Sequence, residues 1–332
     1  MIPPLVLARN DAAERTFHNY GKRKGMLLEA PQKMCIVCNP VAGSGRAKRM
    51  LPEITALLAQ KGVDFDVVTT AGPGEAETVA RQLPRDEYRA IAAMGGDGTL
   101  NEVVNGILAS DRKPIPVAAI PAGTGNDFVT GNHLFSHWSE SIEALAKFAT
   151  KKMDVMSLRD QAGWSRYAVS SVGIGIDAYV AKRVSELETK KLGRLSYALE
   201  TVRGLFSFEP FDMHVIADDV HTYVEKAWLC ACMKSEYLGG GLIICPGACS
   251  SDGVLSFGYL SNASRPYLLR VLLHVFKGTH VGMRGVRIST ARTLSVEPID
   301  DVPCHLDGDI RNVRFPLDIK VVPEAIEFVV NL

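Results

Sequence analysis

The sequence has no excess of charge of either sign, because 37 lysines and arginines balance 37 aspartates and glutamates among 332 residues. A chain without a basic surplus lacks the electrostatic footprint of a nucleic-acid-binding protein. It also lacks any run of the roughly 18 consecutive apolar residues that a membrane-spanning helix needs, and its N-terminal residues are too charged for a secretory signal. We therefore expect a cytoplasmic protein that binds no nucleic acid.

A disulfide or zinc pattern is missing as well. The seven cysteines are an odd number without the spacing of a disulfide framework. Cys35 and Cys38 have the spacing of half a zinc or redox motif, but the strand-like run MCIVC points them to opposite faces. No second pair completes a metal site, and no HExxH stretch is present. We interpret these cysteines, and Cys230 and Cys232, as buried apolar side chains in a reducing compartment.

What the sequence does have is a regular alternation in its first half. Short apolar runs typical of strands are each followed by a stretch with helical periodicity. Such strand–helix units predict an α/β domain, a parallel sheet with helices on both faces. The predicted strands are 34–40, 64–70, 89–96 and 114–123, and the predicted helices are 46–60, 74–83, 99–108 and 138–150.

The pattern changes near residue 153, after which short strand-like runs dominate. Only two long helical segments, 178–206 and 265–277, interrupt them. This organisation favours a mostly antiparallel, sandwich-like β domain. A chain of 332 residues is also long for a single hydrophobic core. We predict an N-terminal extension over 1–32, an α/β domain over 33–153 and a β-rich domain over 154–332.

The stretch Gly95-Gly96-Asp97-Gly98-Thr99 marks one junction between a predicted strand and a predicted helix. Glycines there let a ligand approach the backbone, and the start of the following helix offers free N–H groups to an anion. Asp97 beside phosphates would be repulsive unless a cation such as Mg²⁺ lay between them. On this loop alone, an ordinary capped glycine turn and a phosphate site are equally good interpretations.

Two further loops, NPVAGSGRA over 39–47 and PAGTGNDF over 121–128, also follow predicted strands. All three loops would lie at the carboxyl ends of parallel strands, where open α/β sheets bind their ligands. The sequence has no P-loop motif, and neither GxG pair has the third glycine of a dinucleotide-binding motif. A nucleotide or another polyphosphate held by three loops is the better interpretation.

Taken together, the three loops resemble those of the diacylglycerol kinase catalytic-domain superfamily, which includes bacterial lipid kinases, sphingosine kinases and ceramide kinases. The family pattern joins an NPxxGxG-type loop, a GGDGT loop followed by NEVxNG, and a PxGTxNDF loop. The resemblance continues into the second half and covers about residues 33–330. The matching stretches of the second half are Val172–Ala178, Lys191–Tyr197, Ser251–Leu255 and Leu306–Asp309.

The resemblance implies an ATP- and Mg²⁺-dependent lipid kinase that binds the nucleotide between its two domains. It implies that Asp307 is the general base for a lipid hydroxyl and that Asp97 takes part in catalysis. The implied Mg²⁺ ligands are Asp97, Asp127 and Asp252. The implied ATP contacts are Asn39, Gly43, Ser44, Gly45, Arg46, Thr70, Gly95, Gly96, Gly98, Thr99, Gly123, Thr124, Asn126 and Asp309.

This sequence departs from the family pattern at two positions near the implied sites. Asp309 replaces a longer glutamate, and Ser251 replaces the first of two aspartates, which weakens the case for a metal at Asp252. Two other interpretations therefore stay open beside the kinase. One is an NAD kinase, which shares the GGDGT loop, and the other is a non-catalytic sensor of a nucleotide or lipid.

The sequence does not name the acceptor of the phosphate. Diacylglycerol is the first candidate, and sphingosine, ceramide and phosphatidylglycerol are the alternatives. The segment 265–292 mixes apolar and basic residues, so it is either a packed helix or a surface for transient, peripheral contact with an anionic membrane. His280 within it is expected in a solvated loop, and a homodimer is left open.

Overall fold

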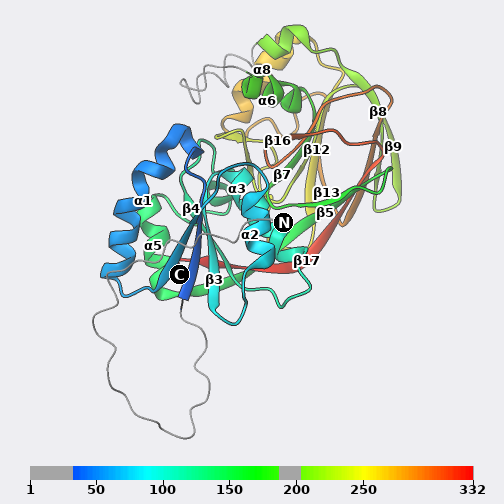
Figure 1. The fold of residues 1–332 in the computed structure, drawn as a ribbon. Helices are drawn as coiled ribbons and strands as arrows, with labels where there is room; N and C mark the ends of the chain where they lie inside the picture. The colour runs from blue at the N-terminus through cyan, green and yellow to red at the C-terminus, as the bar shows by residue number, and fades with distance from the viewer. Residues whose placement is uncertain (1–32, 187–202, 332) are drawn as a thin grey trace, which may run out of the picture.

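The computed structural model describes residues 33–186 and 203–331. The predicted extension over 1–32, the motif over 191–197 and the middle of the predicted helix over 178–206 lie outside the described residues. The described part of the chain has two large hydrophobic cores. One lies within the α/β half and the other within the β-rich half (Figure 1). Within these ranges no helix is both long enough and apolar enough to span a bilayer.

The first half is the predicted parallel sheet. Its four strands lie in the order β2-β1-β3-β4, and each neighbouring pair is parallel. The central strands are almost wholly buried apolar runs, as expected where helices cover both faces. Helices α1 and α5 lie on one side of the sheet, and α2 and α3 on the other (Figure 1). The elements are β1 Lys33–Cys38, α1 Ala42–Gln60, β2 Phe65–Thr69, α2 Glu75–Gln82, β3 Tyr88–Gly95, α3 Asp97–Leu108, β4 Val117–Pro121, α4 Asp127–Gly131 and α5 Trp138–Lys147.

Helix α5 ends earlier than predicted. Phe148 adopts a left-handed conformation with φ 58°, which terminates the helix at Lys147. The next strand, β5, begins at once and runs over Ala149–Asp160. The predicted helical state of Ala149 and Thr150 is therefore wrong. The left-handed residue Phe148 ends the helix, and Ala149 and Thr150 already belong to β5, which continues into the second core.

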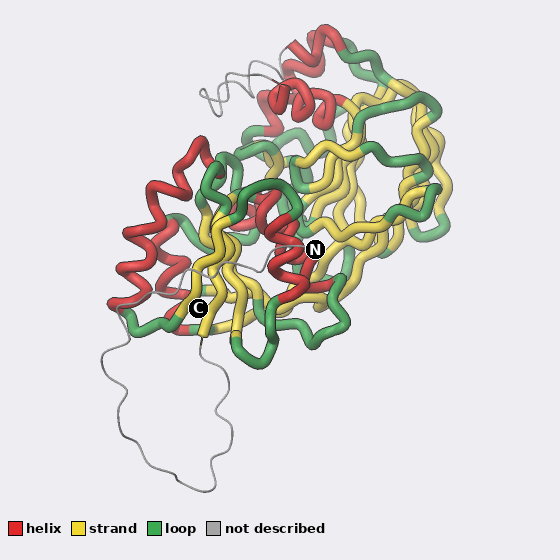
Figure 2. Tube along the Cα trace, in the orientation of Figure 1, coloured by secondary structure: helices red, strands yellow, loops and turns green. Residues whose placement is uncertain are grey.

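The second half consists mainly of strands (Figure 2). These strands pair antiparallel, which confirms the predicted fold class. Its helices α6 and α8 gather at one end of the strands (Figure 1). The elements are β6 Ser165–Ala168, β7 Ser171–Gly175, α6 Ile176–Glu186, β8 Phe211–Ala217, β9 Val220–Met233, β10 Tyr237–Leu238, β11 Leu242–Ile243, β12 Leu255–Ser261, α8 Arg265–Val275, β13 Val286–Ala291, β14 Thr293–Pro298, β15 Cys304–Leu306, β16 Asp309–Arg311 and β17 Leu317–Val330.

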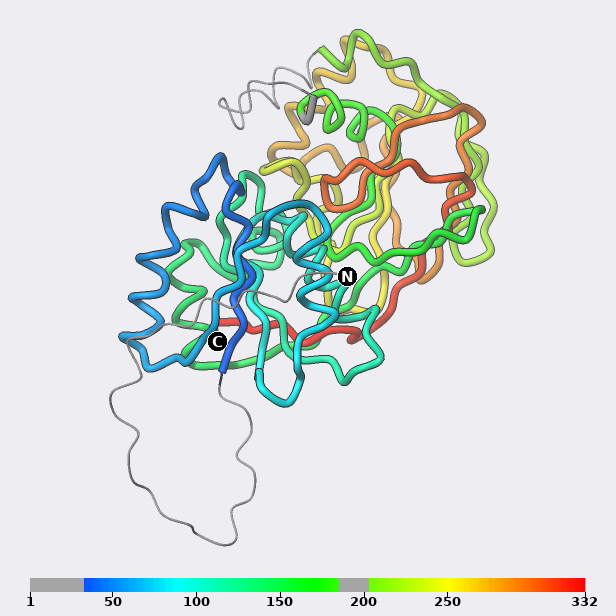
Figure 3. The backbone as a smooth tube through the Cα atoms, in the orientation of Figure 1, coloured from blue at the N-terminus to red at the C-terminus, as the bar shows by residue number. Residues whose placement is uncertain are grey.

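Two long strands connect the halves. Strands β5 and β17 pair antiparallel along most of their length and run from one core to the other. At its end β17 returns to the α/β half, where Phe328 pairs in parallel with Val117 of β4 (Figure 3). Phe328 and Ile326 also pack in the first core. A domain boundary at 153 stays a prediction, because the C-terminal strand belongs to both cores.

The cysteines behave as small buried side chains. Cys35, Cys38, Cys230 and Cys232 are all free and all buried. Burial in apolar surroundings raises the pKa of the Cys38 thiol to about 11, so this thiol stays protonated and unreactive.

Candidate active site

The three glycine-containing loops meet at one edge of the parallel sheet, because β1, β3 and β4 are neighbours and run in the same direction. Their contact leaves no room for side chains. A Cβ placed on Gly123 would lie 2.3 Å from Cα of Gly96, and one placed on Gly43 would lie 2.3 Å from the carbonyl oxygen of Ala122. Glycine at these positions is therefore what allows the loops to pack together.

The first loop turns through three consecutive left-handed residues. Gly43, Ser44 and Gly45 have φ values of 58°, 56° and 80° before α1 becomes regular. The two side chains that border the loop bind the other loops. Arg46 donates from Nε to the carbonyl oxygen of Ala122 at 3.2 Å, and Asn39 donates from Nδ2 to Oγ1 of Thr99 at 3.2 Å. Both side chains therefore fix the loops to one another.

The carboxylates of Asp97 and Asp127 both approach Gly125 of the third loop. A Cβ placed on Gly125 would lie 3.2 Å from Oδ2 of Asp97 and 3.5 Å from Oδ2 of Asp127. Their Oδ1 atoms accept hydrogen bonds from backbone N–H groups, Asp97 from Phe128 at 3.0 Å and Asp127 from Gly240 at 2.8 Å. Burial, together with the charge of Asp97, raises the pKa of Asp127 to about 7. Burial also raises the pKa of Asp97.

This pair fits Mg²⁺. A magnesium ion prefers hard oxygen ligands and is commonly held by one or two carboxylates together with substrate phosphates. The two half-buried carboxylates repel each other, and a cation between them would remove that repulsion. The chemistry of these donors therefore agrees with a metal–nucleotide complex at the loops.

The remaining side chains predicted to contact ATP lie at different depths. The Thr124 side chain is exposed on the third loop, and Asn126 closes that loop by accepting a hydrogen bond from the Gly123 N–H at 3.0 Å. Thr70 follows the edge strand β2 and is only 6% exposed. Its hydroxyl donates to the carbonyl oxygen of Cys38 at 3.4 Å. Thr70 is thus turned toward the protein, whereas Thr124 faces solvent.

Asp307 and Gly308 form the two-residue turn of the hairpin between β15 and β16. Both have positive φ, 47° and 86°, as a type I′ turn requires. Asp307 is a buried residue, only 5% exposed. It accepts hydrogen bonds from the N–H groups of residues 169, 170 and 171, each at 2.8 Å, and from Nδ2 of Asn101 at 2.7 Å. Burial raises the pKa of Asp307, and these hydrogen bonds oppose the rise.

Asp309, which follows this turn, lies beside the second glycine loop. A Cβ placed on Gly98 would lie 3.5 Å from both carboxylate oxygens of Asp309. The Asp309 side chain is 48% exposed, and its nearest cation is Arg311, whose Nη2 lies 3.4 Å from Oδ2. The D-G-D turn, residues 307–309, therefore brings one accessible carboxylate from the β-rich half to the second glycine loop.

The residues that hold the two halves together were not predicted from the sequence. Asn101 and Asn105 of α3 both donate from Nδ2 to the carbonyl oxygen of Tyr167, at 2.8 and 2.9 Å. Arg166 donates to Oδ1 of Asn101 at 3.3 Å and pairs with Glu77 at 2.9 Å. A signal was present, because two amides four residues apart on an otherwise apolar helix face need buried partners.

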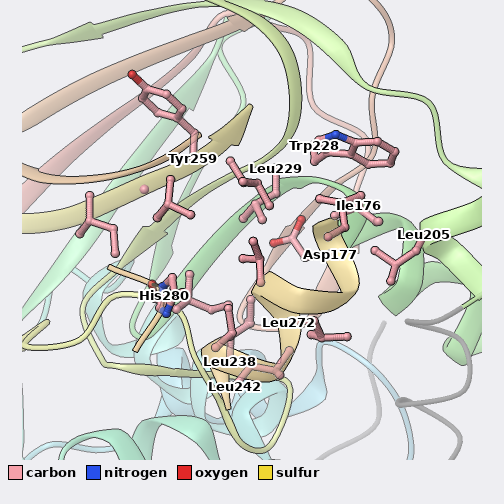
Figure 4. A pocket seen from close by; sticks show the side chains of 18 of the residues that line it. Ile176, Asp177, Leu205, Trp228, Leu229, Leu238, Leu242, Tyr259, Leu272 and His280 are labelled. Atoms are coloured by element: carbon pink, nitrogen blue, oxygen red, sulfur yellow. Dashed lines mark hydrogen bonds between the residues drawn. The ribbon is translucent and has the colours of Figure 1, made fainter. Parts of the chain in front are cut away.

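An apolar cavity of about 110 Å³ lies between α6, α8 and strands β9, β12 and β13 (Figure 4). Asp177 is an acidic side chain in its lining, and Oδ2 of Asp177 is buried without a hydrogen bond. Nε2 of His305 lies 3.3 Å from this oxygen. His305 in turn accepts a hydrogen bond from the Gly308 N–H at 3.3 Å, so the cavity is connected to the D-G-D turn.

His280 also lines this cavity, so the expectation of a solvated loop is wrong. The residue is 4% exposed, and its Nε2 lies 2.9 Å from the carbonyl oxygen of Ile244. Burial lowers the pKa of His280, which favours the neutral imidazole. The apolar part of the lining consists mainly of Ile176, Val180, Leu205, Trp228, Leu229, Leu238, Leu242, Ile244, Leu260, Leu268, Val271, Leu272, Val275, Val286 and Ile288.

The surroundings of Asp252 do not fit the expected Mg²⁺. Oδ1 of Asp252 lies 2.9 Å from Nζ of Lys234, a side chain with no exposed surface. No group of three or more acidic, histidine or cysteine side chains that could hold a metal is present in the described part of the chain. An ion pair with lysine occupies the position where the resemblance implied a metal ligand.

Comparison with known proteins agrees with this architecture. The model of the diacylglycerol kinase catalytic domain matches residues 33–158, and that of the YegS C-terminal NAD kinase beta sandwich-like domain matches residues 170–330. A diacylglycerol kinase of Mycobacterium tuberculosis is 27% identical over 299 residues, which cover 89% of this chain and 94% of that protein. A diacylglycerol kinase of Staphylococcus carnosus is 24% identical over 274 residues, which cover 82% of this chain and 87% of that protein.

Among solved structures, a diacylglycerol kinase from Bacillus anthracis has the same fold. It superposes with a TM-score of 0.67 at 20% identity and covers 90% of this chain and 97% of that chain. The two matched models together span both halves of the described structure, in the order that the sequence predicted. The chain therefore belongs to the diacylglycerol kinase catalytic-domain superfamily, and it is a phosphotransferase of the lipid kinase class.

Proposed function

We propose that this enzyme transfers the γ-phosphate of ATP to a hydroxyl group of a membrane lipid, with diacylglycerol as the first candidate and Mg²⁺ as the cofactor. The observation that carries the proposal is the approach of Asp309 to Gly98, which sets a carboxylate of one half against a nucleotide loop of the other. Phosphoryl transfer depends mainly on positioning and charge neutralisation. The three loops and the carboxylates beside them supply both.

Asp97 and Asp127 are the residues that would hold Mg²⁺. When bound, the ion would neutralise the charge of the phosphate groups. The backbone N–H groups at the start of α3 would face the phosphates, since the first turn of a helix leaves these donors free. Arg46 and Asn39 would keep the loops in contact while the nucleotide binds.

The base belongs to the D-G-D turn, and we propose that it is Asp309. The resemblance assigned this role to Asp307, but that carboxylate would first have to release one of its four hydrogen bonds. A general base must come within hydrogen-bonding reach of the proton that it removes. Asp309 is partly exposed and already faces the loops, whereas Asp307 fixes the geometry of the turn.

A lipid acceptor is supported by the apolar cavity beside the turn. Apolar side chains dominate its lining, and the buried Asp177 carboxylate is connected through His305 to Gly308. Such a cavity would hold part of one acyl chain, with the polar end of the lipid toward Asp177. The relatives named diacylglycerol kinase make diacylglycerol the first acceptor to test.

Helix α8 would bring the cavity to the membrane. Its inner face is buried at Leu268, Val271 and Val275, which line the cavity. On the outer side Leu273 is 67% exposed and Phe276, just past the helix, is 51% exposed. The exposed basic residues Arg270 and Lys277 lie beside them, a combination that suits peripheral contact with anionic lipid.

The proposal is tested by following radiolabel from γ-labelled ATP into lipids presented in mixed micelles. Diacylglycerol, sphingosine, ceramide and phosphatidylglycerol are compared, with NAD as a soluble acceptor and a chelator as the metal-free arm. We expect label in a lipid, and none without Mg²⁺. Label in NAD, or nucleotide binding without transfer to any acceptor, would contradict the proposed function in favour of one of the two other interpretations.

A further inference from the structure

Lys234 follows the end of β9 and has no exposed surface. Its Nζ lies 2.9 Å from Oδ2 of Asp154, 2.9 Å from Oδ1 of Asp252 and 2.5 Å from the carbonyl oxygen of Val254. A lysine ammonium has three N–H donors and no acceptor. Three donors thus meet three oxygens, two of them carboxylate oxygens, so the contacts match the charged form of the side chain.

The oxygen atoms around this ammonium are held in place by the backbone. Oδ2 of Asp154 also accepts a hydrogen bond from the Gly253 N–H at 2.8 Å, and Oδ1 accepts one from the Glu324 N–H at 3.0 Å. Burial alone would raise the pKa of Asp154, but these bonds and the bond from Lys234 outweigh it and lower the pKa. Asp154 is therefore an ionised carboxylate although it is only 2% exposed.

Two carboxylates and a carbonyl oxygen converging on one point are also ligands that Mg²⁺ would accept. Nζ and a metal ion cannot occupy that point together. We propose that the Lys234 ammonium takes the place of the divalent cation that the family resemblance implied at Asp252. We call the site formed by Lys234, Asp154, Asp252 and the Val254 carbonyl the ammonium cage. Its cation is a side chain of the protein, so the site needs no metal.

The ammonium cage also supports the active site. The Lys234 N–H donates to the carbonyl oxygen of Ser170 at 2.8 Å, and the hydroxyl of Ser235 bonds that of Ser170 at 2.8 Å. The Ser170 N–H then donates to Oδ1 of Asp307 at 2.8 Å. A cation fixed at Lys234 therefore holds the backbone that cradles Asp307, whatever the concentration of Mg²⁺.

The test is thermal unfolding of nucleotide-free protein in millimolar Mg²⁺ and in chelator. The wild type is compared with Lys234→Asn, which leaves room for a hydrated ion, and with Lys152→Asn, which removes an exposed lysine paired with Glu324. We expect the wild type and Lys152→Asn to show the same small difference in Tm between the two buffers, which comes from Mg²⁺ at Asp97 and Asp127. In chelator Lys234→Asn should unfold about 5–10 °C lower, because two carboxylates lose their cation, and Mg²⁺ should restore much of that loss.

Further variants locate the Mg²⁺ response. The double variant Lys234→Asn with Asp252→Asn should respond to Mg²⁺ only as much as the wild type does, because Asp97 and Asp127 are unchanged in every protein and contribute equally. A wild-type Tm that falls in chelator by more than the Tm of Asp252→Asn would overturn the proposal. So would a Lys234→Asn variant that responds to Mg²⁺ no more than Lys152→Asn.

The proposal can still be tested if Lys234→Asn does not fold. The wild type and Asp252→Asn then carry the test, because Asp252 is 38% exposed and its substitution is tolerable. We expect both proteins to show the same small fall in Tm in chelator. A chelator effect that is larger in the wild type than in Asp252→Asn would show that a metal, and not Lys234, is the cation of this site. Because these measurements use no substrate, their outcome is independent of the proposed lipid kinase reaction.

Discussion

Nδ2 of Asn101 donates a hydrogen bond of 2.7 Å to Oδ2 of Asp307, across 206 residues of sequence. Asn101 lies in the helix that starts at the second glycine loop, and Asp307 begins the D-G-D turn of the other half. This single bond therefore links the position of the D-G-D turn to the position of the second glycine loop. A change in either residue should alter both the stability of the fold and the geometry of the site.

Asn101→Ala should destabilise the protein by about 1–3 kcal/mol, because Asp307 and the Tyr167 carbonyl each lose a buried donor. Asn101→Asp should cost more, since it places a second carboxylate against Asp307. Urea unfolding measures both losses. Asn312→Ala, at an exposed asparagine, is the control and should leave the midpoint unchanged. Equal midpoints for Asn101→Ala and Asn312→Ala would mean that the bond contributes nothing to stability.

Asp309→Asn and Asp307→Asn should have different effects. Asp309→Asn should reduce kcat by at least about 100-fold, as expected for loss of a general base, while the Tm and the Kd for ATP stay close to the wild type. Asp307→Asn should lower the Tm by several degrees, because three backbone N–H groups lose their charged acceptor. Turnover, ATP binding and thermal unfolding are measured for both variants.

The general base is the residue whose substitution abolishes turnover but leaves the Tm and the affinity for ATP unchanged. If Asp307→Asn keeps its Tm and its ATP affinity but loses turnover, the base is Asp307, as the family resemblance implied. If Asp309→Asn retains turnover, Asp309 serves only to contact the nucleotide loop near Gly98.

The three loops were predictable because their signals are local. Each follows a buried apolar run, and the adjacency of β1, β3 and β4 follows from the usual right-handed connections between parallel strands. The turn at Asp307 was predictable too, since Asp-Gly is a strong signal for a two-residue hairpin. Its burial was not, because the donors at residues 169–171 approach only when β15 pairs with β7.

The ammonium cage shows what a sequence cannot reveal. Lys234 follows an apolar strand and looks like an ordinary polar terminus, but one of its carboxylate partners lies 80 residues before it and the other 18 residues after it. Only the tertiary fold tells a buried ammonium from a solvated one. His280 is a similar case, because the loop around Ile244 buries it against expectation.

Gly123→Ala should disrupt the junction of the loops. The added Cβ would lie 2.3 Å from Cα of Gly96, so one of the two loops must move. We expect the Kd for ATP, measured by calorimetry, to rise at least about 10-fold, roughly 1.4 kcal/mol of binding free energy. Gly72→Ala is the matched control, because its Cβ would meet nothing within 4 Å and its φ is not left-handed. Unchanged ATP binding by Gly123→Ala would show that the loops adapt without loss.

The Asp97–Asp127 pair makes stability depend on pH in a defined direction. The pKa of Asp127 is about 7 in the folded protein, because of burial and the charge of Asp97, against 3.8 for an ordinary aspartate. The folded state therefore binds a proton more tightly than the unfolded state does. Its contribution to the free energy of unfolding is greatest at low pH and is lost as the pH rises from about 4 to about 7.

Urea midpoints measured in chelator between about pH 5 and pH 8 check this direction. The wild-type midpoint minus that of Asp127→Asn should fall as the pH rises toward 7, since the uncharged side chain does not titrate. Mg²⁺ should reverse the trend, because the ion binds the ionised pair and competes with protons, so it stabilises the wild type more at pH 8 than at pH 6. Asp252→Asn, which leaves this pair intact, should keep the wild-type dependence. A difference that is constant with pH would mean that Asp127 is ionised throughout and that Asp97 does not perturb it.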